Sequence, residues 1–279
     1  MLFIENFNKI KQKFIWETPF IQMFCAAVFA SAGKTADTGT VIRERKLLMQ
    51  NSACFPSGWS TFSAAASAVI AAGVREVRIK EIPQTCRILK QNGVPDSVYL
   101  PLAACILTAS AEAEEKISRL CERTAFLYSR TGSSPRELIS AVSCALTAEA
   151  EGIEDEKLYS RYMTANYLLS DLNADFVRRA AMQIFAETDD IGEKCRVIRA
   201  ACEEFPAEEI PTALFALRPE EIPAACRRFR EVLTDTEQYA GNAARACAAY
   251  ITLSEYHHRN PLIFLTEMPD CFHEEFRAS

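Results

Sequence analysis

The chain has 279 residues, of which 49% are apolar and 24% charged, a composition typical of a folded globular protein and not of a disordered one. Its net charge of −6 argues against a nucleic-acid-binding protein, because phosphate backbones attract proteins that carry an excess of basic residues. No apolar run approaches the roughly 20 residues that cross a bilayer, so we expect no membrane span.

The first 50 residues predict three helices. Apolar side chains recur at helical spacing from Phe3 to Ile15, which indicates an amphipathic helix at the start of the chain. Two more helices are expected over residues 18–31 and 40–50.

The apolar run over residues 19–32 has a second interpretation. It ends in Ala-Ser-Ala, follows several lysines and so resembles the core of a secretory signal. Glu17 lies next to this run and Gln22 interrupts it, which favours a packed helix.

A short alanine-rich segment returns through the middle of the chain. Its copies end at Ala72, Ala109, Ala148 and Ala186, with offsets of 37, 39 and 38 residues. A period in this range is typical of helical-hairpin repeats.

Polar turns precede these segments. In the clearest one, Ser134 is placed as the N-cap, Pro135 at the first helical position and Glu137 where it can reach back to the cap. Further turns are expected at residues 92–96, 171–175, 205–206 and 234–236. Each joins a more polar helix to an alanine-rich one, and weaker copies are expected near Pro56, Pro206 and Gly241.

An isolated helical hairpin cannot bury its apolar face, whereas stacked hairpins can. We therefore predict an all-α array of about six or seven antiparallel helical hairpins, an α-solenoid-like α/α superhelix, with a closed α/α toroid as the alternative. The array is expected to form one domain over 1–279, with N-terminal helices at 1–50, hairpin repeats at 51–255 and a C-terminal capping segment at 256–279. The alanine-rich helix is expected to be the inner one of each pair.

Eleven cysteines occur without any Cys-x-x-Cys pair. Those beside alanines are expected to act as small packing residues: Cys25, Cys105, Cys144, Cys226 and Cys247. Free thiols in this number indicate a reducing compartment, so we expect a cytoplasmic protein.

Two motifs resemble ligand sites but lack essential features. Ser31 to Thr35 ends like a phosphate-binding loop, yet Val28 stands where that motif needs glycine, so Gly33 is interpreted as a helix C-cap. His257, His258, Cys271 and His273 match no zinc-site spacing. No metal, cofactor or catalytic set is expected from these residues.

Charged clusters are interpreted as helix ends and solvated helix faces. The acidic groups lie at residues 112–115, 149–156 and 189–190, beside predicted turns, where carboxylates favour helix N-termini. The basic groups at 43–46 and 227–230 both have acidic neighbours.

Aromatic residues near the turns are the candidate binding residues. Trp59 lies in a glycine- and proline-flanked turn, and Tyr99, Tyr128 and Tyr162 recur near hairpin turns. They can anchor a ligand or partner, or they can pack in the core.

The chain resembles the domain-of-unknown-function 4003 family, an uncharacterised family found mainly in Gram-positive bacteria. The likeness lies in Gly58-Trp59-Ser60, in the segment 99–104, and in Phe126-Leu127 followed by 138–146, and it extends from about residue 5 to 255. It implies an all-helical fold and supplies no catalytic or binding residues.

The expected function is a cytosolic scaffold or adaptor that binds a protein or peptide, because helical arrays present extended concave surfaces. An α/α-toroid enzyme with carboxylates on its turns, and a sensor of a small hydrophobic ligand, are the alternatives. Neither a nucleic acid nor a membrane is expected as a partner, and the oligomeric state is left open.

Overall fold

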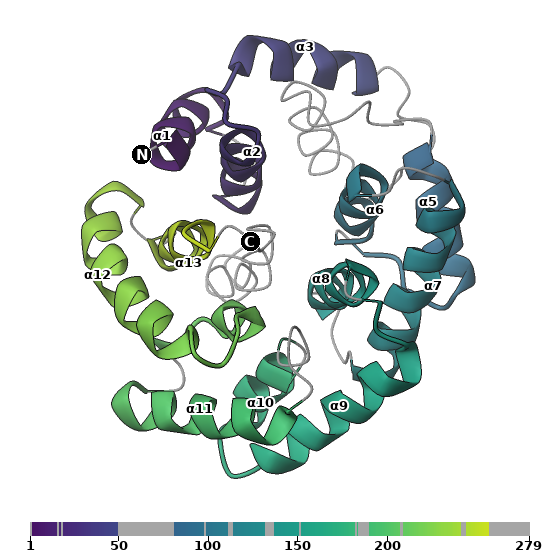
Figure 1. The fold of residues 1–279 in the computed structure, drawn as a ribbon. Helices are drawn as coiled ribbons and strands as arrows, with labels where there is room; N and C mark the ends of the chain where they lie inside the picture. The colour runs from purple at the N-terminus through teal and green to yellow at the C-terminus, as the bar shows by residue number, and fades with distance from the viewer. Residues whose placement is uncertain are drawn as a thin grey trace. The chain divides into compact units, whose positions relative to one another are not determined.

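The computed structural model describes residues 2–15, 17, 19–49, 81–97, 99–110, 114–131, 137–150, 152–181, 183, 190–206, 209–240 and 244–256. Within these residues it contains 12 α-helices and no strand, which confirms the predicted all-α fold for this part of the chain (Figure 1). The chain divides into two compact units, Met1–Val142 (unit 1) and Ser143–Ser279 (unit 2). The single domain over 1–279 stays a prediction.

The three helices predicted for the first 50 residues are confirmed. They are α1 (Leu2–Lys13), α2 (Pro19–Ser31) and α3 (Thr38–Met49), and α1 packs against both of the others. Phe3, Phe7 and Ile10 are buried on one face of α1, as their spacing predicted. Ile15 was expected on this face, but it follows the end of the helix and is 66% exposed.

Three polar residues hold these helices together. Asn6 is fully buried; its amide donates to the Lys34 carbonyl at 2.9 Å, and its oxygen accepts from the Ala36 amide at 2.7 Å. Gln22 donates to the carbonyls of Phe14 and Glu17, while the Glu17 carboxylate pairs with Arg45. Of the two residues that interrupt the apolar pattern, Gln22 therefore satisfies the backbone between α1 and α2, whereas Glu17 joins this segment to α3. α2 itself packs against α1.

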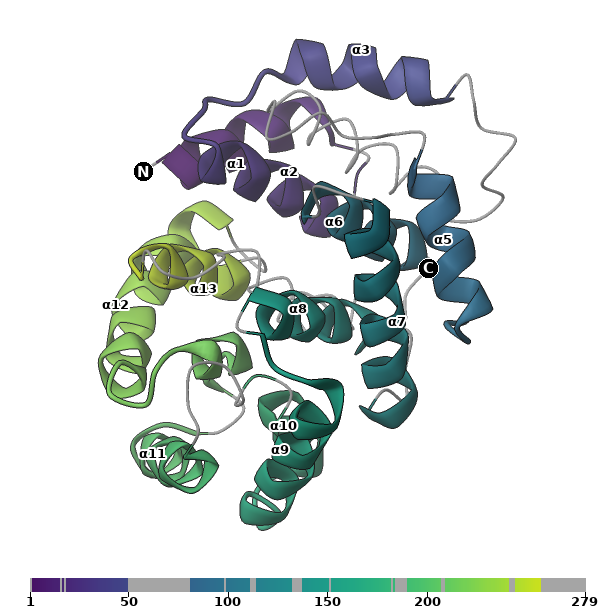
Figure 2. The same cartoon turned by 45° about the vertical axis from the view of Figure 1, so that its right-hand side comes forward.

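The rest of unit 1 contains a second group of packed helices. α5 (Ile82–Gln91) contacts both α6 (Tyr99–Ser110) and α7 (Glu114–Thr131), and α6 contacts α7 (Figure 2). α8 (Glu137–Ala150) follows, and the boundary between the units falls inside it. The contact of α5 with α6 confirms the predicted pair around residues 92–96. α7 and α8 are the helices expected on either side of residue 134, their pairing stays a prediction, and the cap at 132–136 lies outside the described residues.

Glycine ends three of the helices in the same way. Gly33, Gly93 and Gly152 have φ angles of +66°, +92° and +65°. At each, the glycine amide and the next amide donate back to the final turn, as in Val94 to Leu89 at 3.0 Å. This is the Schellman motif, and it confirms Gly33 as a helix C-cap.

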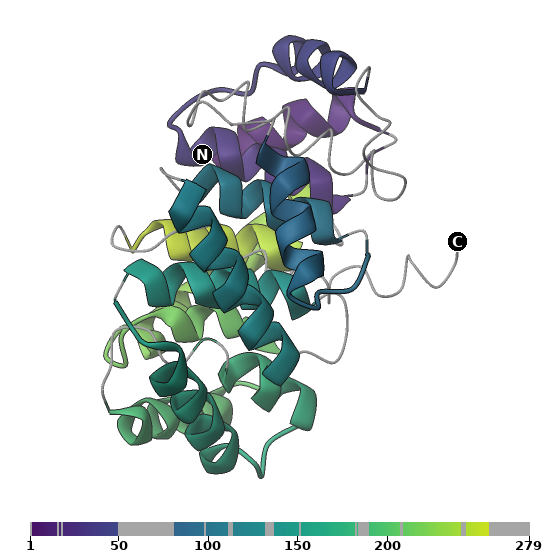
Figure 3. The ribbon, with the colours of Figure 1, turned by 90° about the vertical axis from the view of Figure 1, so that its right-hand side faces the viewer.

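Unit 2 contains six elements after α8, which are α9 (Asp155–Leu168), α10 (Ala174–Ala181), α11 (Ile191–Glu204), the 3-10 helix η4 (Thr212–Ala216), α12 (Ile222–Ala240) and α13 (Ala244–Ser254), in the part of the chain that the structure describes. α9 contacts α10 and α11, α11 contacts α12, and α12 contacts α13. Figure 2 labels these helices, and Figure 3 shows the same ribbon, in the same colours, from another side. η4 contacts α10, α12 and α13. The predicted turns at 171–175 and 205–206 are confirmed as the ends of α9 and α11.

Alanine-rich and polar helices differ in how much of their surface is buried. In α13, nine of the 11 residues are buried, among them Ala246 and Ala249. In α12 the buried residues keep to one face, with Ile222, Ala225 and Phe229 at spacings of three and four. α6 and α5 differ in the same sense. Small side chains therefore let the alanine-rich helix of a pair be enclosed, while its partner covers it.

Two predictions about unit 2 are wrong. The turn predicted at 234–236 is part of α12, where the hydroxyl of Thr236 donates to the Val232 carbonyl at 2.9 Å and so satisfies itself within a helix. The alanine-rich helix expected after Pro206 is the short, fully buried η4. The copy predicted over residues 47–72 lies almost wholly outside the described residues.

Candidate functional site

The four predicted binding residues are placed differently. Trp59 lies outside the described residues. Tyr99 begins α6 and Tyr128 lies in the last turn of α7, both half-buried. Tyr162 of α9 is 7% exposed and stacks on Tyr159, with ring centroids 6.3 Å apart. Burial, and then the Glu137 carboxylate, raise the pKa of Tyr128 above its ordinary value. Their role in binding stays a prediction.

A small pocket lies in unit 2, between α12 and the segment that follows α11. Its volume is about 90 Å³, and its lining consists of Phe205, Glu209, Ile210, Cys226, Phe229, Arg230, Leu233 and Arg245. Four lining residues, at 226, 229, 230 and 233, come from one face of α12 because they are three or four positions apart. Arg245 comes from α13, and the other three from the segment between α11 and η4.

The walls of this pocket are apolar and its charges lie at the rim. Phe205, Ile210 and Phe229 are 6%, 3% and 4% exposed, whereas the side chains of Arg230 and Glu209 are 55% and 58% exposed. An apolar floor with a polar rim is the arrangement of a binding site, since apolar contact supplies affinity and the rim sets orientation.

Arg230 is held at the rim by two contacts. Its guanidinium carbon lies 4.4 Å from the centre of the Phe205 ring, and one of its nitrogens lies 3.4 Å from a Glu209 carboxylate oxygen. Stacking on a ring leaves the N–H edge of a guanidinium turned away from that ring. The pocket lining thus carries an oriented hydrogen-bond donor.

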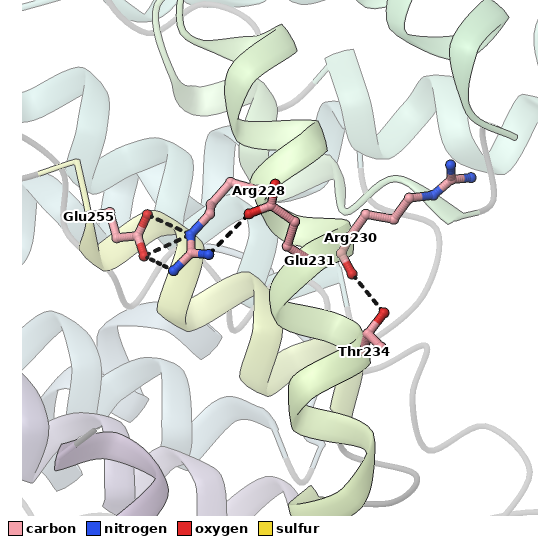
Figure 4. Close-up of polar contacts among 5 residues, drawn as sticks. All are labelled: Arg228, Arg230, Glu231, Thr234 and Glu255. Carbon is pink, nitrogen blue, oxygen red and sulfur yellow. Dashed lines mark hydrogen bonds and ion pairs between the residues drawn. The ribbon is translucent and has the colours of Figure 1, made fainter.

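A second arginine of the stretch 227–230, Arg228, is engaged on a different side of α12 (Figure 4). It donates to both carboxylate oxygens of Glu255 at 2.8–3.1 Å and to Glu231 at 3.1 Å. Figure 4 shows the Arg230 side chain extending away from this cluster, while its backbone carbonyl accepts from Thr234 at 3.2 Å. The three arginines of 227–230 are each at least 39% exposed and each lie within ion-pair distance of a glutamate, which fits the predicted solvated face. Arg230 in addition lines the pocket.

The thiols of the described residues are poor candidates for nucleophiles. Seven of the eight free cysteines there are buried, and Cys202 is half-buried, which confirms the packing role predicted for Cys25, Cys144, Cys226 and Cys247. Burial raises the pKa of Cys226 to about 12 and that of Cys202 to about 11. A thiol with such a pKa is protonated at neutral pH and attacks slowly.

Among the described residues, no group of three or more His, Cys, Asp or Glu side chains is arranged to hold a metal ion. The histidines at 257, 258 and 273 lie outside this part of the chain. Asp190, in the predicted acidic group at 189–190, caps α11 by accepting from the Glu193 amide at 2.8 Å. No helix in the described ranges is long and apolar enough to cross a membrane.

The pocket was not identified from sequence. The sequence pattern places Phe205 only in a turn and Arg230 only on a charged helix face. The signal that could have identified it is the spacing of Cys226, Phe229 and Leu233, an apolar face of α12 with Arg230 in its middle.

Comparison with known proteins finds a family match for the first part of the chain. Residues 6–130 match the model of a family described as protein of unknown function, DUF4003. The predicted resemblance is confirmed over this range, which includes Tyr99 and Tyr128, and from there to residue 255 it stays a prediction. No curated protein and no solved structure matches the chain.

Proposed function

We propose that this protein binds a protein or peptide partner and that the pocket of unit 2 receives one apolar side chain of that partner. The observation that carries the proposal is the combination of buried aromatic and aliphatic walls with an oriented arginine at the rim. Interface anchors have this composition, since a few desolvated apolar contacts beside an arginine carry most of the binding free energy.

The size of the pocket favours a side chain over a whole small molecule. Its volume is about 90 Å³, whereas pockets for drug-sized ligands measure about 300–1,000 Å³. A cavity of about 150 Å³ holds benzene, so this one suits a branched aliphatic side chain. The proposal therefore ranks above the sensor of a small hydrophobic ligand.

The lining also favours binding over catalysis. Its titratable groups are two arginines, Glu209 and Cys226, and burial keeps the Cys226 thiol protonated at neutral pH. A general acid–base catalyst works best with a pKa near the operating pH. The toroid enzyme thus receives less support from this site than the binding protein does.

We also propose that the helix pairs stack into the α-solenoid-like array of six or seven hairpins and that the protein works in the cytoplasm. Consecutive contacts from α9 to α13 support stacking within unit 2. Free cysteines, eight of them in the described ranges, suit a reducing compartment.

Peptides selected from a displayed random library on the purified full chain test the proposed function. Leu233→Trp fills the pocket, whereas Thr234→Trp adds the same side chain at an exposed neighbouring position. We expect selected peptides to lose at least about tenfold in affinity, or about 1.4 kcal/mol, for Leu233→Trp and to bind Thr234→Trp as they bind the wild type. Equal binding to both variants, or no selectable peptide, would contradict the proposal.

A further inference from the structure

The pocket of unit 2 has the parts to recognise the end of a peptide chain. We propose that it binds the C-terminal residue of its partner, with an aliphatic side chain inside the cavity and the terminal carboxylate on Arg230. This inference rests on the proposed function, because it names the chemistry of the segment that the pocket receives.

The charge of the lining points to an anion. Two guanidiniums, of Arg230 and Arg245, line the pocket together with one carboxylate, that of Glu209. The lining therefore carries one more positive than negative charge, and a guanidinium at its rim can pair with an anion whose apolar part lies against the buried walls. A guanidinium offers paired N–H donors that match the two oxygens of a carboxylate.

Arg230 is oriented before any ligand arrives. Phe205 supports the face of the guanidinium at 4.4 Å, so a carboxylate can approach its N–H edge without the arginine first losing its conformational freedom. Preorganisation of this kind increases affinity because less entropy is lost on binding.

Glu209 holds the place that a ligand carboxylate would take. It meets Arg230 through one contact of 3.4 Å, and both side chains are more than half exposed. A single exposed ion pair of this length contributes little to stability, so an incoming carboxylate with better geometry can displace it. Glu209 is thus a built-in competitor that sets how strongly the pocket prefers an anion.

The small cavity distinguishes a chain terminus from an internal acidic residue. Arg230 lies in the lining of a space of about 90 Å³, so the carboxylate and the apolar side chain must reach it from nearly the same point. At a C-terminal leucine, isoleucine or valine both groups are attached to one Cα atom. An internal glutamate carries its carboxylate on a separate residue, whose side chain points elsewhere.

Matched peptides test the inference on the full chain. The probe is Gly-Ser-Gly-Ser-Leu with fluorescein on its N-terminus, prepared with a free C-terminal carboxylate or with an amide, and binding is followed by fluorescence polarisation. We expect the carboxylate form to bind at least about tenfold more tightly, the equivalent of about 1.4 kcal/mol. In Arg230→Gln the ratio of the carboxylate affinity to the amide affinity should fall to about 1. Glu209→Gln should tighten binding of the carboxylate form by up to about fivefold.

Arg228→Gln is the matched control, because it removes the same charge two positions away on α12 from an arginine that Glu255 and Glu231 already engage. It should leave the preference unchanged. Three results would each overturn the inference. The carboxylate and amide peptides could bind with equal affinity, or Arg228→Gln and Arg230→Gln could reduce the preference for the carboxylate equally. Amidated Gly-Ser-Leu-Glu-Ser, with an internal glutamate, could also bind as tightly as the carboxylate probe. If one of these results is found but the peptides still bind and Leu233→Trp abolishes that binding, the proposed function stands and only the C-terminal inference fails. If no peptide binding sensitive to Leu233→Trp is found, both the inference and the proposed function fail.

Discussion

At the scale of single residues, a few polar side chains decide how the apolar helices of unit 1 connect. Asn6 is the clearest, since a fully buried amide satisfies one carbonyl and one amide of the segment between α2 and α3. Buried backbone groups without a partner are costly. Asn6 therefore allows this segment to pass over the apolar face of α1.

Asn6→Ala should lower the free energy of unfolding by about 1–3 kcal/mol, because it removes the partner of the buried Ala36 amide and the part-buried bond to the Lys34 carbonyl. Urea denaturation followed by circular dichroism measures the change. Asn92→Ala is the control, since its amide makes one exposed bond, to the Ile88 carbonyl at 2.9 Å, and should cost less than about 1 kcal/mol. A loss for Asn6→Ala no larger than that for Asn92→Ala would show that the buried amide is not required.

The buried thiols make the free energy of unfolding fall as pH rises through the alkaline range. Burial raises the pKa of Cys86, Cys121 and Cys226 from 9.0 to about 12. Above pH 9 the unfolded chain releases these protons while the folded chain keeps them, so the free energy of unfolding falls as pH rises. Below pH 9 both states keep the protons, and the thiols contribute their full stabilisation.

We expect the urea midpoint to be unaffected by the thiols below pH 9.0 and to fall as pH rises from 9.0 toward 12, the interval between their ordinary and raised pKa. It should fall less steeply in a variant that carries Cys86→Ala, Cys121→Ala and Cys226→Ala. The difference between the two proteins isolates the thiols from lysines and tyrosines. Identical pH profiles would mean that the thiols do not account for the fall.

At the scale of helices, small residues allow one helix of a pair to be enclosed. Ala104 in α6, Ala141 in α8 and Ala249 in α13 have no exposed surface. Alanine and cysteine at a contact let helix axes approach toward the lower end of the roughly 8–10 Å range. Such a contact has no room for a larger side chain.

Ala141→Leu should destabilise the protein by about 1–3 kcal/mol, because three extra carbons must fit into a closely packed contact. Ala224→Leu makes the same change at an exposed position of α12 and should stay within about 0.5 kcal/mol of the wild type. Thermal melts by circular dichroism compare the two. A melt of Ala141→Leu that matches Ala224→Leu would count against close packing around α8.

At the scale of the whole molecule, the question is whether the two units unfold together. Their boundary lies between Val142 and Ser143, inside the continuous helix α8. Unfolding of one unit therefore removes part of a helix on which the other depends. Stacked repeats also couple each pair to its neighbour.

We expect a single cooperative transition, as the predicted single domain over 1–279 requires. Differential scanning calorimetry should give a calorimetric enthalpy equal to the van't Hoff enthalpy. Two resolved transitions would contradict one domain. Ala141→Leu in unit 1 and Asp190→Ala, which removes the cap of α11 in unit 2, should both shift the same transition.

Much of the fold was predictable because its signals are local. The predicted helices at 18–31 and 40–50 correspond to α2 and α3, and the predicted turn at 171–175 separates α9 from α10. Helical spacing and caps act within one or two turns of chain, so a short window contains them. The same local signals misplaced a turn at 234–236, which lies inside α12. Threonine and aspartate have low helix propensity, but tertiary context overrides propensity at these positions.

The amino-acid sequence by itself determined that this chain forms helices, that the alanine-rich ones are enclosed and that the cysteines beside them are packing residues. Only the tertiary structure decided which carboxylate each of two nearby arginines meets and which of the two lines a pocket. Arg228 meets Glu255, 27 residues away, and Arg230 meets Phe205 and Glu209, which precede it by 25 and 21 residues. Such contacts depend on how separate helices are brought together, and no spacing within a single helix encodes them.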